Sequence, residues 1–209
     1  MIKLSANKIW WSMLLALLLP LLFLAVDIAN ENLGADPVKA VHIRLGDWSL
    51  RLLCLTLLVT PLQTITLWRG MADFRQLLGL LCWFYASLHV WVYIAVDQGW
   101  QWQLIAGDMM ESKYIWFGLL SYVILLLLAL TSSVFAMRLL GRFWKKLHRY
   151  IYLAAVAASI HYFWQLKGNL AEPTVYAVLI SLLLLFRLVS WLRAKPLKVM
   201  GVLKRLGVS

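Results

Sequence analysis

Histidines are the residues of this chain whose chemistry and position point to a cofactor site. Only four occur among its 209 residues, and three of them, His89, His148 and His161, lie in or at the edge of long apolar runs. An unsatisfied polar group in hydrocarbon is costly, so each needs either a hydrogen bond to a neighbouring helix or a metal. Imidazole is a common axial ligand of haem iron. The fourth histidine, His42, lies among polar residues and is expected to be solvated.

The depths of His89 and His161 favour iron. His89 lies 13 residues after Gln76, where one predicted span begins, and His161 lies 14 residues after Leu147, where another begins. At about 1.5 Å per residue, both lie roughly 20 Å deep from the same side. Two imidazoles at one depth on two helices of a bundle can bracket a haem iron, so both are candidate axial ligands.

Small side chains precede both histidines along the same helical faces. They are Cys82 and Ala86 before His89, and Ala154, Ala157 and Ala158 before His161. Small residues would leave room for a flat macrocycle against the helix, and they would equally let two helices pack closely.

His148 cannot ligate the same iron as His161, because 13 residues of helix separate them by about 20 Å. A second haem at its level would need a second axial ligand, but the matching stretch, Arg75-Gln76-Leu77, has no histidine. His148 is therefore either half of an unusual second site or a polar residue at the headgroup boundary.

The elements that must position these residues are membrane helices. The chain is 63% hydrophobic and 14% charged, against roughly 45–50% and about 25% in soluble domains. Apolar runs predict spans at 9–28, 48–67, 76–96, 114–136, 147–165 and 172–191, the first being too long for the apolar part of a signal peptide. We expect no internal repeat among these spans. We expect an all-α bundle of six transmembrane helices over residues 1–192, with haem between helices three and five, and a basic cytoplasmic tail over 193–209.

Basic residues in the loops predict the orientation. Thirteen lie on one side: Lys3, Lys8, Arg69, Arg75, Arg138, Arg142, Lys145, Lys146, Arg193, Lys195, Lys198, Lys204 and Arg205. Only four lie on the other: Lys39, Arg44, Lys113 and Lys167. Because loops rich in Lys and Arg stay in the cytoplasm, both termini are expected there. Arg51, Arg149 and Arg187 fall near span ends, where long side chains can snorkel.

Other chemistry finds little support. Hydrolase motifs such as H-E-x-x-H and G-x-S-x-G are absent. Cys54 and Cys82 have no ligand-like spacing and are interpreted as core residues. A proton or ion pathway would place carboxylates mid-membrane, yet Asp27, Asp47 and Asp97 lie at span ends. A transporter or scaffold whose histidines only join helices is the rival interpretation.

Several stretches resemble a known family. They are Leu33-Gly-Ala-Asp-Pro-Val-Lys39, the segment from Leu78 to His89, the segment from Arg142 to Leu153, and Ile160-His-Tyr-Phe-Trp164. In order and spacing the chain resembles the MsrQ (YedZ) family, haem-binding membrane subunits of the periplasmic protein-methionine-sulfoxide reductase system, within the ferric-reductase-like transmembrane group.

The resemblance implies a b-type haem held by His89 and His161, with His148 as a further haem-site histidine, and a bound FMN. It implies an electron-transfer subunit in the bacterial inner membrane rather than the catalytic subunit. Electrons would come from the quinone pool or a cytosolic flavin reductase. They would pass to a periplasmic molybdopterin reductase, MsrP, that repairs oxidised proteins.

The wider group carries two histidine pairs on two helices. Here span five keeps His148 and His161 but span three keeps only His89, so the second haem stays open. Another quinol-linked cytochrome b is the alternative within the same chemistry.

Overall fold

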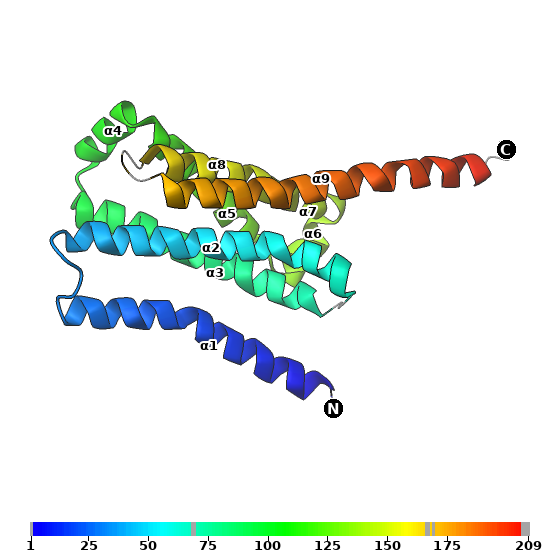
Figure 1. The fold of residues 1–209 in the computed structure, drawn as a ribbon, viewed down its shortest axis with the longest axis horizontal. Helices are drawn as coiled ribbons and strands as arrows, with labels where there is room; N and C mark the ends of the chain where they lie inside the picture. Colours follow the sequence, from blue (N-terminus) through cyan, green and yellow to red (C-terminus); the bar gives the residue numbers. More distant parts are fainter. Residues whose placement is uncertain (1, 68–69, 166–167, 169, 206–209) are drawn as a thin grey trace.

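The computed structural model describes residues 2–67, 70–165, 168 and 170–205 (Figure 1). Throughout these ranges the regular structure is helical. The elements are α1 (Ile2–Ala29), α2 (Pro37–Thr66), α3 (Met71–Trp91), the π-helical turn η1 (Val92–Asp97), α4 (Trp102–Glu111), α5 (Lys113–Leu130), α6 (Val134–Leu140), α7 (Arg142–Leu147), the 3₁₀ turn η2 (His148–Tyr150), α8 (Ile151–Gln165) and α9 (Ala171–Arg205). Arg69 and Lys167, which entered the charge comparison, lie outside the described residues.

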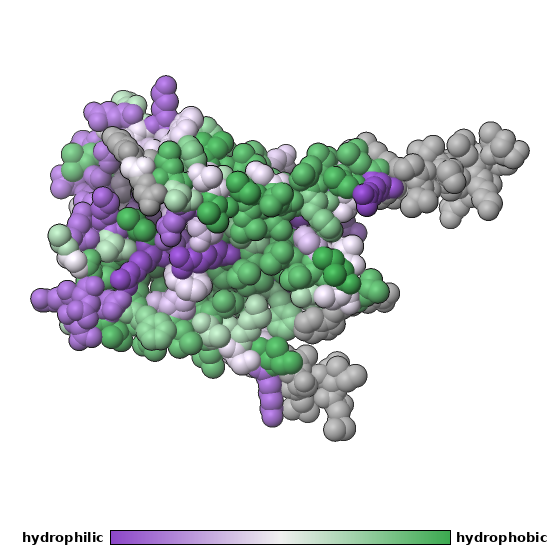
Figure 2. All heavy atoms as spheres, in the orientation of Figure 1, coloured by the Kyte–Doolittle hydropathy of each residue, from purple (hydrophilic) through white to green (hydrophobic). Residues whose placement is uncertain are grey.

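Five helices of the described chain are long and apolar enough to cross a membrane. They cover Lys8–Ala29, Pro37–Thr66, Asp73–Asp97, Lys113–Leu130 and Ala171–Arg193. The expected span at 147–165 consists of η2 followed by α8, whose 15 residues extend only about 22 Å against a hydrocarbon core of about 30 Å. The membrane fold is confirmed, and the sixth span stays a prediction. In Figure 2, apolar side chains cover the middle of the molecule, and hydrophilic ones gather at the end that holds α4 and the α1–α2 turn.

Two helix pairs form the centre of the bundle. α2 packs along α3, and α5 packs along α8. The pairs meet where α3 contacts α5, and α9 lies against both α2 and α8. Arg187 of α9 points into the bundle instead of snorkelling, because it donates to the Tyr152 hydroxyl at 2.6 Å, the Thr60 hydroxyl at 2.8 Å and the Leu57 carbonyl at 3.0 Å.

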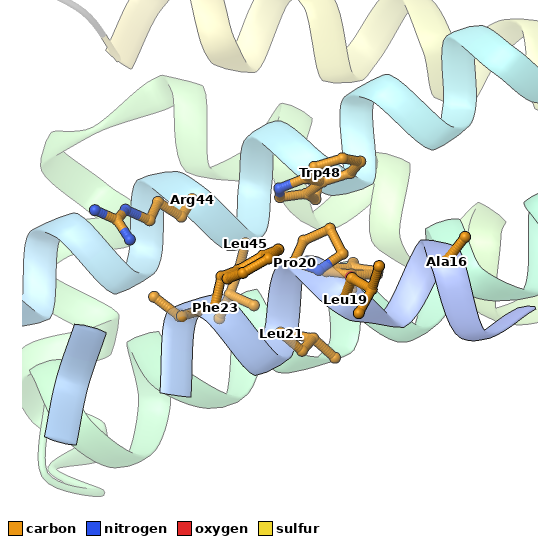
Figure 3. A pocket seen from close by; sticks show the side chains of 10 residues that line it. Ala16, Leu19, Pro20, Leu21, Phe23, Arg44, Leu45 and Trp48 are labelled. Atoms are coloured by element: carbon orange, nitrogen blue, oxygen red, sulfur yellow. The ribbon is translucent and has the colours of Figure 1, made fainter. Parts of the chain in front are cut away.

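The first helix is attached more loosely. α1 lies beside α2 and α3 over part of its length (Figure 1). The Tyr85 hydroxyl donates to the Leu17 carbonyl at 2.7 Å, and Arg44 forms an ion pair with Asp27. Between α1 and the rest lies a groove of about 370 Å³, lined mostly by apolar side chains, with Arg44 at its edge (Figure 3). The groove contains no histidine, so it is not the site that the sequence predicts.

Predicted spans and observed helices differ in their bounds at α2, α5 and α9, and α9 continues to Arg205 instead of ending near residue 191. α2 begins at Pro37, well before residue 48, because Asp36 caps it by accepting from the Lys39 amide at 3.0 Å and proline suits a first helical position. His42 therefore lies inside a helix and not in a loop. At the other end, α5 stops at Leu130 instead of continuing to 136, and Ser133 caps a separate α6.

The expectation of no internal repeat was wrong, because α2–α3 and α5–α8 are two copies of one unit. Ile43-x2-Gly46-x2-Ser49 matches Ile115-x2-Gly118-x2-Ser121, 72 positions later, and Ala86-Ser-Leu-His89 matches Ala158-Ser-Ile-His161 at the same shift. The contacts repeat as well. The Ser49 hydroxyl donates to the Cys82 carbonyl at 3.1 Å, and the Ser121 hydroxyl donates to the Ala154 carbonyl at 3.0 Å. Interchangeable apolar residues between these positions hide the repeat in the sequence.

Candidate haem site

The structure brings His89 and His161 together. His89 comes from the end of α3 and His161 from the end of α8, one from each helix pair. Their ring centres are 6.3 Å apart and their planes are nearly perpendicular, at 87°. α3 and α8 end where α2 and α5 begin, on the left in Figure 1, and each ring is hydrogen-bonded to a carbonyl near the start of α2 or α5. The π-helical turn η1 begins three residues after His89, and such turns are common at functional sites.

The His161 imidazole is held by the start of α5. Its Nδ1 lies 2.8 Å from the carbonyl oxygen of Tyr114. A carbonyl only accepts, so Nδ1 carries the proton and Nε2 keeps a free lone pair. The ring also lies against the backbone of Gly118, where a Cβ would approach Nδ1 to 2.7 Å.

The His89 imidazole is held in the same way by the start of α2. Its Nδ1 lies 2.9 Å from the carbonyl oxygen of His42, which again leaves the Nε2 lone pair free. A Cβ at Gly46 would lie 3.1 Å from the ring. Metal-bound histidines commonly donate the other ring N–H to a backbone carbonyl in this way.

The spacing of the two rings fits two ligands of one metal. A metal–imidazole bond is about 2 Å long and the ring centre lies about 1 Å farther, so ligands on opposite sides of one iron have ring centres about 6 Å apart. The observed 6.3 Å matches this value. The residues present therefore fit a haem with two axial histidines.

His42 is not solvated, which corrects the expectation from its polar neighbours. Its ring stacks on His89 with centres 3.7 Å apart and planes at 23°. Its Nε2 is buried and has no hydrogen-bond partner in the part of the chain that the structure describes. The helix that Asp36 and Pro37 start carries His42 into the bundle. His42 thus contributes both a carbonyl and a stacked ring to the surroundings of His89.

The small residues serve helix packing at two positions. Cys82 and Ala154 have no exposed surface, and each carbonyl accepts a serine hydroxyl from the adjacent helix of its pair. Of the two interpretations that the sequence left open, close helix contact describes these two residues.

His148 lies in a different setting. Its Nδ1 is 3.2 Å from the Trp144 carbonyl of its own helical segment, and its ring stacks on Trp144 at 4.0 Å. Its Nε2 is buried without a partner among the described residues. The residue 72 positions earlier is Gln76, whose side-chain amide donates to the Ser132 carbonyl at 2.9 Å. The structure does not bring a second imidazole to His148.

Sequence reasoning missed the two glycines and the two carbonyls that hold the rings. The signal was present as the repeated Gly-x2-Ser pattern and the repeated Ala-Ser-x-His pattern. Only the recurrence of both patterns 72 positions later would have indicated that the glycine of one pattern lies against the histidine of the other.

Comparison with known proteins points to one family. Residues 45–159 match the family described as ferric reductase like transmembrane component. The protein-methionine-sulfoxide reductase heme-binding subunit MsrQ of Brucella anthropi is 45% identical over 77% of this chain and 73% of its own length. The proteins of the same name from Brucella ovis and Brucella melitensis are 41% identical over 77% of this chain and 72% of their own lengths.

Proposed function

The chain belongs to the MsrQ family within the ferric reductase like transmembrane proteins, and we propose that it is a b-type cytochrome that carries electrons across the inner membrane to a methionine sulfoxide reductase. The family makes it a membrane haem-binding subunit of such a reductase system. The observation that carries the proposal is the pair of imidazoles, His89 and His161, with ring centres 6.3 Å apart.

The residues of this chain would hold and tune the cofactor. His89 and His161 would be the axial ligands, and each keeps its free Nε2 because a backbone carbonyl accepts the Nδ1 proton. Bound haem would supply one-electron chemistry at its iron. The surrounding helices would exclude water and provide an apolar environment that helps to set the reduction potential. His148, whose Nε2 has no hydrogen-bond partner among the described residues, is the candidate ligand for a second haem. FMN is proposed from the family resemblance alone.

The site's place in the bundle supports outward electron delivery. His89 and His161 lie at the end of α3 and α8 opposite the loops rich in Lys and Arg, which we propose face the cytoplasm together with both termini. Electrons would enter from the quinone pool or a cytosolic flavin reductase. The acceptor would be the periplasmic molybdopterin protein MsrP, docking on the hydrophilic end of the molecule (Figure 2). Methionine sulfoxide in oxidised proteins would be reduced there and not on this chain.

Reoxidation kinetics test the proposal. The purified protein is reduced with dithionite and mixed in a stopped-flow instrument with the periplasmic reductase, with and without methionine sulfoxide. We expect the reduced haem spectrum to decay faster when partner and substrate are both present. The His161→Ala variant, expected to lack this haem, controls for direct reduction by dithionite.

The outcomes separate the alternatives. Reoxidation no faster than in buffer would reject the assigned partner and favour another quinol-linked cytochrome. A purified protein without a haem absorption band would favour the transporter or scaffold interpretation.

A further inference from the structure

We propose that Gly46 and Gly118 are positioning residues that seat the two axial imidazoles through one backbone device, used once in each copy of the repeat. The inference rests on the proposed haem function and adds residues that act on the ligands without touching the cofactor. The device consists of a carbonyl, a glycine four residues later on the same helix, and a histidine from the next helix of the pair.

The geometry of an α-helix explains why the glycine is needed. The carbonyl of residue i points toward residue i+4, whose amide it accepts. The acceptors are the carbonyls of His42 and Tyr114, so the residues at i+4 are Gly46 and Gly118. Here each ring reaches its carbonyl by lying over the backbone at i+4, so a Cβ at that residue would crowd the ring.

The distances show how closely the rings lie on the glycines. An added Cβ at Gly118 would be 2.7 Å from Nδ1 and 2.8 Å from Cε1 of His161. An added Cβ at Gly46 would be 3.1 Å from both Nδ1 and Cε1 of His89. The first separation is too short for nonbonded atoms, and the second requires the ring to shift. His161 therefore lies closer to its glycine than His89 does.

Helix propensity disfavours glycine at both positions, which supports the interpretation that these glycines make room for the rings. Glycine inside a helix costs about 1 kcal/mol relative to alanine, and Gly46 and Gly118 both lie inside helices. Alanine would strengthen each helix locally, so a loss of haem in an alanine variant would not come from a weaker helix.

A displaced ring would lose its bond to the carbonyl. The Nδ1–H···O=C bond fixes the tautomer and ring orientation and raises the basicity of Nε2. Without it the histidine is a weaker donor to ferric iron, so haem should bind less tightly and its midpoint potential should rise.

A graded series of glycine variants tests the proposal. The full-length protein is prepared with Gly118→Ala, Gly46→Ala, Gly79→Ala and Gly107→Ala. The last two are controls, because an added Cβ meets only Thr56 Cγ2 at 3.9 Å at Gly79 and nothing within 4 Å at Gly107. Haem per protein, the low-spin ferric EPR signal and the midpoint potential are measured, with membrane accumulation followed through a fused fluorescent reporter.

The expected order follows the contact distances. Gly118→Ala should lower haem affinity about tenfold or more, the range seen when an outer partner of a metal-bound histidine is lost. Gly46→Ala should retain more haem, with shifted EPR g-values and a raised potential. Both controls should match wild type.

Three results would overturn the proposal. The first is a Gly118→Ala variant with wild-type haem content, EPR signal and potential. The second is equal loss in the two controls. The third applies if Gly118→Ala fails to accumulate. In that case, an unchanged EPR signal and midpoint potential in Gly46→Ala would show that the glycines do not position the rings. Haem that is present in wild type but not reoxidised by the partner would refute the proposed electron acceptor and leave the positioning role intact.

Discussion

The two levels of the bundle use the same repeat differently. At the level of His89 and His161, both copies carry a histidine, and each ring is bound by a carbonyl of the adjacent helix. At the level of His148, only one copy carries a histidine, and that ring binds the carbonyl of Trp144 in its own segment. Its counterpart, Gln76, binds the Ser132 carbonyl. Duplication thus gives a facing pair of imidazoles only where both copies keep the same residue.

The two levels also differ in what holds their imidazole rings. When a ring is hydrogen-bonded to a carbonyl of another helix, its position depends on how the two helices pack. The His148 ring instead stacks on Trp144, one turn away in its own segment, and Trp144 in turn donates to the Thr131 carbonyl at 2.8 Å. The level of His89 and His161 is therefore preorganised by tertiary structure, as a precise ligand pair requires.

The largest effect is expected from removing either imidazole of the facing pair. His89→Ala and His161→Ala should each abolish the low-spin haem spectrum, because one remaining axial nitrogen cannot hold the iron between two helices. Haem per protein in the purified variants measures this. Normal haem content in either variant would reject the ligand assignment.

A smaller effect is expected from His148→Ala. The pair at the other level should keep its haem, because His148 lies about 20 Å away along the helical rise and bonds the Trp144 carbonyl and not either ring of the pair. Any loss should be limited to a second spectral component. The two variants can be compared by haem quantification and EPR on matched preparations. Loss of all haem from His148→Ala would show that the two levels are coupled.

The sequence predicted that His89 and His161 come together, but not the groups that hold their rings. Counting residues from the span starts was enough to place His89 and His161 at one level, because helical rise is regular. The same counting failed for His42, because hydropathy marks where a helix is embedded in lipid and not where it begins. Asp36 and Pro37 were the local signal for the earlier start.

Counting residues along a predicted span could not reveal that the two rings lie against Gly46 and Gly118. A glycine is informative only when the residue that lies over it is known, and His161 is 43 positions from Gly118. The same spacing between Gly46 and His89 makes the link visible once the repeat is recognised. Composition hid the repeat, since leucine, isoleucine and valine substitute freely on lipid-facing surfaces.

The paired serines allow a quantitative comparison of the two copies. Ser121→Ala and Ser49→Ala each remove one interhelical hydroxyl bond, worth about 0.6 kcal/mol on average in membrane proteins. Ser121 is buried and Ser49 only partly so, and we expect the larger loss of thermal stability in detergent for Ser121→Ala. Haem content should stay normal in both. A larger loss for Ser49→Ala would mean that α2–α3, and not α5–α8, depends more on this bond.

The smallest effect is expected at the ring that stacks on His89. The His42 carbonyl belongs to the backbone, so a side-chain substitution leaves the acceptor of the His89 Nδ1 proton in place. His42→Phe keeps an aromatic face at the 3.7 Å stacking distance and removes a buried nitrogen that has no partner among the described residues. We expect haem content and the EPR signal to match wild type. His42→Ala should also retain haem but lose some thermal stability, because the ring leaves a cavity. If His42→Phe instead lost haem while folding normally, the imidazole itself would be needed beside His89. The support of His89 would then differ in kind from that of His161, where Tyr114 supplies the carbonyl.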